Sequence, residues 1–65
     1  MTVSIDEQVK CVEREIGMRV RVYPAWVQNG RMTQAKADHE LKAMRAVLAT
    51  LEAIQKERAH PSLPL

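Results

Sequence analysis

Apolar residues near the start of this chain recur at the spacing of one helix face. They fall at Ile5, Val9, Val12, Ile16 and Val20, which are four, three, four and four positions apart. This spacing places all five side chains on one side of an α-helix. Ser4 lies just before the stripe and Glu7 three positions later, which is the pattern of a capping box. We therefore expect a helix that begins after Ser4 and runs to about Val22.

The segment after this stripe contains residues that interrupt helices. Pro24 disfavours helical geometry at Tyr23, although a proline can open a new helical turn because its missing N–H is not needed there. Asn29 and Gly30 suit the end of a helix, where glycine adopts positive φ. Residues 18–23 also alternate as a strand would, but a single strand has no partner here. The sequence predicts a connector that contains one short helical turn.

A second, longer helix is expected from about Gln34 to Ala59, capped by Thr33 and ended by His60 and Pro61. Its larger apolar surface comprises Ala37, Leu41, Met44, Val47, Leu48, Leu51 and Ile54. This surface should pack against the stripe of the first helix. The fold class is therefore all-α: a helical hairpin of two antiparallel helices forming a single domain over residues 1–60, with a flexible tail over 61–65.

The small size of the chain points to self-association. With 65 residues and one cysteine it cannot form an internal disulfide, and small chains usually need an additional source of stability. A strip of small residues on the second helix, Ala35, Ala46, Ala49 and Ala53, would let another helix approach closely. The alternative is that alanine is simply a good helix former. We expect a homo-oligomeric helix bundle.

Aromatic and basic residues gather around the connector. Residues 16–37 hold four Lys or Arg and no Asp or Glu, and the only two aromatic residues lie among them. Aromatic rings stack on bases and guanidinium groups bind phosphates, and the first amides of the second helix favour anions. The predicted ligand-binding residues are Arg19, Arg21, Tyr23, Trp26, Arg31, Lys36 and Glu40, which suit a nucleotide-like small molecule.

Two alternatives to a ligand site remain open. Tyr23 and Trp26 could cap a small core while the arginines are solvated, or they could form the centre of a contact with a protein partner, since Trp, Tyr and Arg dominate such contacts. Glu40 faces the apolar surface, so it should pair with Arg21, Arg31 or Lys36 unless it accepts from a ligand.

Several other functions find little support in the sequence. His39 and His60 are too far apart to share a metal, and Cys11 is expected to be a buried structural thiol. We find no catalytic pattern and expect neither an enzyme nor a cofactor. The alanine-rich second helix does not resemble a recognition helix for specific DNA. Without an apolar run of membrane length or a signal peptide, we expect a cytoplasmic protein with no membrane partner.

One longer pattern resembles a known group. The string RVYPxWVxxGRMTQxKAD over residues 21–38 is similar to a segment of small, helical phage and prophage proteins. The resemblance implies a phage-linked accessory role in a bacterial cytoplasm, where such proteins often inhibit host machinery or immunity. Together these features predict a non-enzymatic, anti-defence oligomer that sequesters a phosphate-bearing nucleotide signal. The alternative is a small inhibitor of a host protein that binds through the surface of Tyr23, Trp26 and the arginines.

Overall fold

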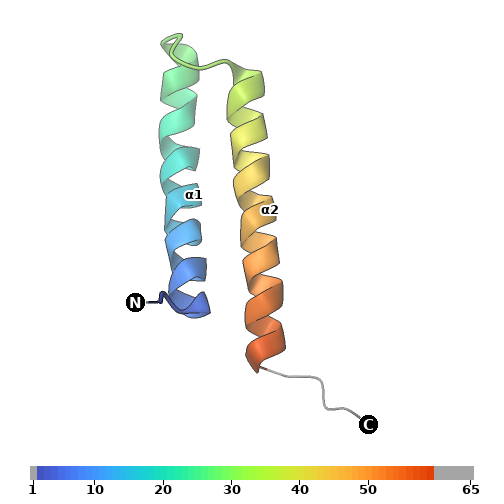
Figure 1. Ribbon diagram of the computed structural model, residues 1–65. Coiled ribbons are helices and arrows are strands. Elements are labelled where there is room, and N and C mark those ends of the chain that lie inside the picture. The colour runs from blue at the N-terminus through green and yellow to red at the C-terminus, as the bar shows by residue number, and fades with distance from the viewer. Residues whose placement is uncertain (1, 60–65) are drawn as a thin grey trace.

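Two antiparallel helices make up the described part of the chain. The computed structural model describes residues 2–59, in which α1 (Ile5–Gln28) and α2 (Gln34–Ala59) lie side by side and residues 29–33 join them at one end (Figure 1). At the open end, the Gln55 side chain donates to Asp6 Oδ1 at 2.9 Å. The predicted all-α hairpin is confirmed. The helix stop at 60–61 and the tail at 61–65 lie outside the described residues.

The helix ends follow the local sequence closely. Ser4 Oγ accepts from the amide of Glu7 at 3.1 Å, and Thr33 Oγ1 accepts from the amide of Lys36 at 3.1 Å. These bonds satisfy amides that have no partner inside the helix. Gly30 takes a φ of +82°, which a residue with a side chain rarely adopts. Both predicted caps, the start of α2 at Gln34 and the role of Gly30 are confirmed.

Helix α1 extends further than predicted. The expected end near Val22, with a separate helical turn in the connector, is wrong because α1 continues through Pro24 to Gln28. Pro24 lacks the N–H that would bond the carbonyl of Val20, but both residues are exposed, so water can reach that carbonyl. The longer helix brings Tyr23 beside Ala37 of α2, and both become buried. Packing therefore outweighs the local preference of proline.

The helices meet along a seam with coiled-coil spacing. On each helix a series of buried or partly buried positions is separated by four, three, four, three and four residues, which is the repeat of two supercoiled helices. The seam consists of Ile5, Val9, Val12, Ile16, Arg19 and Tyr23 on α1, and of Ala37, Leu41, Met44, Leu48, Leu51 and Gln55 on α2. Val20, Val47 and Ile54 were expected inside and are exposed. Arg19 takes the seam position that the sequence pattern assigns to Val20.

The core between the helices is small. Among residues 2–59 only Val9, Tyr23 and Ala37 are buried, and no large side chain is fully enclosed. The lone thiol of Cys11, expected to be buried, is exposed. Two helices give each other only one contact face, so the residues beside the seam stay in solvent. The hairpin therefore leaves much of its apolar surface uncovered.

Candidate functional site

Tyr23 and Trp26 form an aromatic pair at the connector end of α1. Their ring centroids are 5.7 Å apart and the rings are tilted by 37°, within the range of favourable aromatic pairs. The two rings differ in access to solvent, since Tyr23 is 6% exposed and Trp26 is 37% exposed. Tyr23 thus fills the core, as one of the sequence-based alternatives proposed, whereas Trp26 keeps a surface that another molecule can contact.

Three of the predicted site residues lie in a row of alternating charges beside the seam. Arg19 Nε donates to Glu15 Oε1 at 3.0 Å, and Lys36 Nζ lies 3.9 Å from Glu40 Oε1. The hydrogen bond with Glu15 raises the pKa of Arg19, against an opposing effect of burial, and charge interactions with Tyr23 and Glu40 add to the rise. Glu40 therefore pairs with Lys36, whereas the expectation that it would reach Arg21 or Arg31 is not met.

The two remaining arginines have different surroundings. Arg31 is exposed, and its amide donates to the carbonyl of Trp26 at 2.9 Å and to Asn29 Oδ1 at 3.2 Å. These bonds hold the backbone of Arg31 next to the exposed tryptophan. Arg21 is also exposed, but it lies two residues before the buried Tyr23, so it projects roughly 200° away around α1. The structure thus places the backbone of Arg31 beside the backbone of Trp26, whereas Arg21 projects from the outer side of α1.

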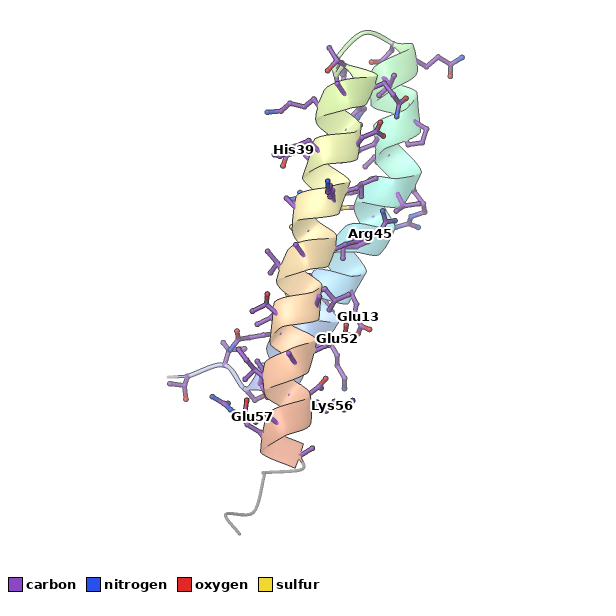
Figure 2. All side chains as sticks on the ribbon, turned by 90° about the vertical axis from the view of Figure 1, so that its right-hand side faces the viewer. Glu13, His39, Arg45, Glu52, Lys56 and Glu57 are labelled. Carbon is purple, nitrogen blue, oxygen red and sulfur yellow. The ribbon has the colours of Figure 1, made fainter. Side chains whose placement is uncertain are left out.

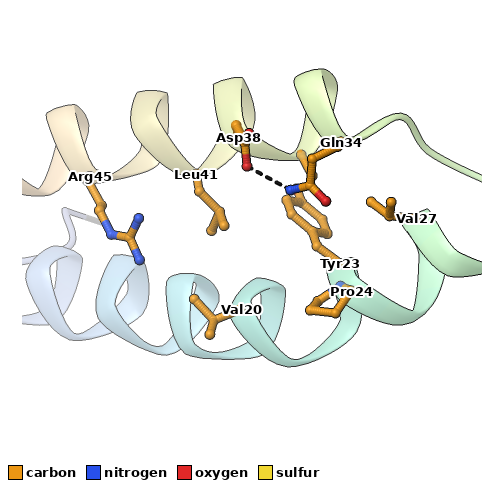
Figure 3. Close-up of a pocket in the computed structure, with 9 residues that line it drawn as sticks. Val20, Tyr23, Pro24, Val27, Gln34, Asp38, Leu41 and Arg45 are labelled. Carbon is orange, nitrogen blue, oxygen red and sulfur yellow. Dashed lines mark hydrogen bonds between the residues drawn. The ribbon is translucent and has the colours of Figure 1, made fainter.

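A groove crosses the two helices near the connector. It has a volume of about 270 Å³, and Val20, Tyr23, Pro24, Val27, Gln34, Ala37, Asp38, Leu41 and Arg45 line it (Figure 3). Gln34 Nε2 donates to Asp38 Oδ1 at 2.8 Å across its rim. Apart from Tyr23, none of the predicted ligand residues lines this groove. The spacing of Gln34, Asp38 and Arg45 along one side of α2 could have indicated this second polar surface.

The connector end combines groups that can bind an anion. Neighbouring acids pair with Arg19 and Lys36, so the segment is less basic in the folded chain than in the sequence. Arg31 is exposed and lies in the connector, close to the first turn of α2, whose amides favour negative charge. This is a combination of one aromatic surface, one guanidinium group and one helix terminus. It can hold a planar group attached to a phosphate.

Wider comparisons add no further assignment. No protein-family model matches the chain, and no curated protein or solved structure matches it. Within residues 2–59, no three His, Cys, Asp or Glu side chains are grouped so that they could hold a metal ion. Neither of the two described helices is long and apolar enough to cross a membrane. The function is therefore inferred from the connector and the surfaces of the hairpin.

Proposed function

We propose that this protein is a non-enzymatic homo-oligomer that captures a phosphate-bearing nucleotide at its connector end. The observation that carries the proposal is the exposed ring of Trp26, together with the hydrogen bond that joins the backbone amide of Arg31 to the carbonyl of Trp26, just before the start of α2. A tryptophan surface stacks on any base, and a guanidinium group binds phosphate through two parallel hydrogen bonds. Capture of this kind requires affinity alone, so it suits a chain too small to enclose a dry catalytic site.

The other predicted residues take supporting roles in this proposal. Tyr23 fixes the ring of Trp26 from the core side. Arg19, Lys36 and Glu40 border the site as paired charges, and a phosphate would compete with the carboxylates for the two cations. Arg21 projects away from the site on its own chain. In the proposed oligomer it would instead contact a ligand that a neighbouring copy holds. A bundle of hairpins would supply these additional contacts and enclose the ligand between chains.

The resemblance to small phage and prophage proteins supplies the proposed setting. In the cytoplasm of a bacterial host, an abundant oligomer that binds a nucleotide signal would keep that signal from its receptor. The proposed role is therefore anti-defence, by sequestration and not by destruction of the signal. It requires that the ligand be recovered chemically unchanged after release from the protein.

Replacing Arg31 with alanine tests the site. Charge-assisted hydrogen bonds contribute about 1.5–3 kcal/mol, so Arg31→Ala should raise the dissociation constant of the ligand roughly tenfold to a hundredfold. Native mass spectrometry of the full chain, with a panel of cyclic and linear nucleotides, would give subunit number and ligand stoichiometry together. Circular dichroism should show unchanged helical content, because Arg31 lies outside both helices.

Arg14→Ala provides a matched control for that experiment. It removes the same charge from an exposed position on α1, roughly 20 Å along the helix from the connector, and should leave binding unchanged. An equal loss of ligand affinity in both variants would indicate that binding depends on net charge alone. Full affinity in Arg31→Ala would exclude the proposed site.

A second candidate is a small inhibitor that binds a host protein. The exposure of Trp26 favours it, since tryptophan is the residue type most often found at the centre of protein contacts. A pull-down from bacterial lysate separates the two candidates. One stoichiometric protein partner that is lost on Trp26→Ala would support the inhibitor, whereas a nucleotide carried by the purified protein would support capture.

A further inference from the structure

One side of the hairpin carries most of the exposed large apolar side chains. Val3 and Val47 line a groove of about 470 Å³ together with Gln8, Cys11, Val12 and Leu51. Met18 lies seven positions after Cys11 and Ile54 seven after Val47, so both fall on the groove side of their helices. We call this side the apolar flank. It is defined by Val3, Cys11, Met18, Val47, Leu51 and Ile54.

The opposite side of the hairpin carries mainly charged side chains. Glu13, Arg45, Glu52 and Lys56 follow it along the two helices (Figure 2), and Asp38 continues it toward the connector. We call this side the charged flank. Of the exposed large apolar side chains in residues 2–59, only Val20 lies here, in the groove with Asp38 and Arg45. Such one-sided segregation is typical of a surface that packs against another polypeptide.

The hairpin also needs more burial than its seam provides. Only three residues of the described chain are buried, and the ordering of two long helices carries a conformational entropy cost that burial must offset. Any partner that binds the folded chain can supply this burial, but a different molecule need not be present wherever the chain is made. A second copy of the same chain is present whenever the first is.

The apolar flank has the size of a small interface between two copies. From Val3 to Met18 it is roughly 22 Å long at about 1.5 Å per residue, and two helices are about 20 Å wide, which gives about 450 Å² per copy, at the low end of the range for protein interfaces. Some of the charges beside it are matched within the chain, in the Glu15–Arg19 and Lys36–Glu40 pairs. Glu7, Lys10 and Arg14 also lie next to Val3 and Cys11 at the edge of the flank.

We propose that the apolar flank is the surface on which a second copy of this chain packs, with the same residues of both copies meeting about a two-fold axis. The four helices then form a bundle whose core is the seam of each hairpin plus the two flanks. This assigns the contact to the flank and not to the alanine strip, whose four residues lie on the outer side of α2 and are exposed.

A matched pair of substitutions on α1 tests the assignment. Met18 on the apolar flank is 42% exposed and Val20 on the charged flank is 44% exposed, and they lie roughly 200° apart around the helix. Sedimentation equilibrium of the full chain over a wide concentration range gives the association state. Met18→Glu should raise the dissociation constant between copies at least about a hundredfold, because it buries an unpaired carboxylate from each copy. Val20→Glu should assemble as the unmodified chain does.

The exposed thiol of Cys11 gives a second measurement that needs no substitution. Cys11 is the only cysteine and lies on the apolar flank, so its reaction with a maleimide should slow as protein concentration rises and copies assemble. Dissociation by Ala49→Glu but not by Met18→Glu would overturn the assignment in favour of the alanine strip. A thiol that reacts equally fast in the assembled protein would overturn it as well.

This inference rests on the homo-oligomer of the proposed function but not on its ligand. If the unmodified chain assembles and Met18→Glu assembles equally well, only the flank assignment fails. If the unmodified chain stays monomeric throughout the range, both the assignment and the proposed oligomer fail. Loss of nucleotide binding by an intact oligomer would leave the flank assignment standing.

Discussion

At the scale of single residues, Arg19 shows most clearly how the seam departs from its apolar pattern. Its neighbours along the seam, Ile16 and Tyr23, are apolar or aromatic, and Arg19 reaches out of the seam to Glu15 at 3.0 Å. A partly exposed ion pair of this kind contributes about 0–1 kcal/mol, less than an aliphatic side chain gains by burial at the same place. A leucine at this position should therefore be more favourable for stability than the arginine.

Arg19→Leu should raise the free energy of unfolding by about 1 kcal/mol, since a buried leucine contributes more than the lost pair with Glu15. Urea unfolding followed by circular dichroism measures the change. Arg21→Leu, on the outer side of α1, is the matched control and should give no increase. A loss of stability in Arg19→Leu would show that the ion pair matters more for the fold than its exposure indicates.

At the scale of elements, α1 shows how packing prevails over a local sequence preference. Pro24 lies inside the helix, one residue after buried Tyr23 and two before Trp26. The helix continues past the proline to Gln28, which places both rings at the connector. The arrangement of the candidate site thus depends on a continuous helix, where the sequence alone predicts a break followed by a separate helical turn.

Pro24→Ala should stabilise the hairpin. Proline inside a helix is less favourable than alanine by up to about 3 kcal/mol, and alanine restores the amide that can bond the carbonyl of Val20. We expect a higher midpoint of thermal unfolding. Gly17→Ala is a useful comparison, since nothing lies within 4 Å of the added methyl group and the expected gain is about 1 kcal/mol. A lower midpoint for Pro24→Ala alone would show that the proline shapes the groove it lines.

At the scale of the whole molecule, hydrogen bonds define the helix ends and the connector of the hairpin, but few of its residues are buried. The caps at Ser4 and Thr33, the turn at Gly30 and the bond between Gln55 and Asp6 define its shape. Its buried interior, by contrast, is limited to a few positions along one seam. The stability of the folded chain should therefore depend on association between copies.

The midpoint of thermal unfolding should consequently rise with protein concentration, because association stabilises the folded state by mass action. Circular dichroism melts of the unmodified chain at several concentrations measure this dependence. Met18→Glu should lower the midpoint and remove most of the concentration dependence. A midpoint that is independent of concentration in the unmodified chain would show that the hairpin is stable as a monomer.

The sequence by itself determined the two helices and their N-terminal ends. The spacing of apolar residues predicted both helices, Ser4 and Thr33 predicted the N-terminal caps, and Gly30 predicted the positive φ. These features depend on residues a few positions apart, so local rules suffice. The same rules predict a candidate site at the connector, where the backbone amide of Arg31 bonds the carbonyl of Trp26.

Only the tertiary structure decided which side chains are covered. It extended α1 past Pro24 because Tyr23 packs beside Ala37, and it put Arg19 instead of Val20 in the seam. It also left Cys11, Val47 and Ile54 in solvent. The physical reason is that burial depends on the angle at which one helix meets the other. A shift of one position in a helical stripe turns a side chain by roughly 100°, and only the partner helix selects between such neighbours.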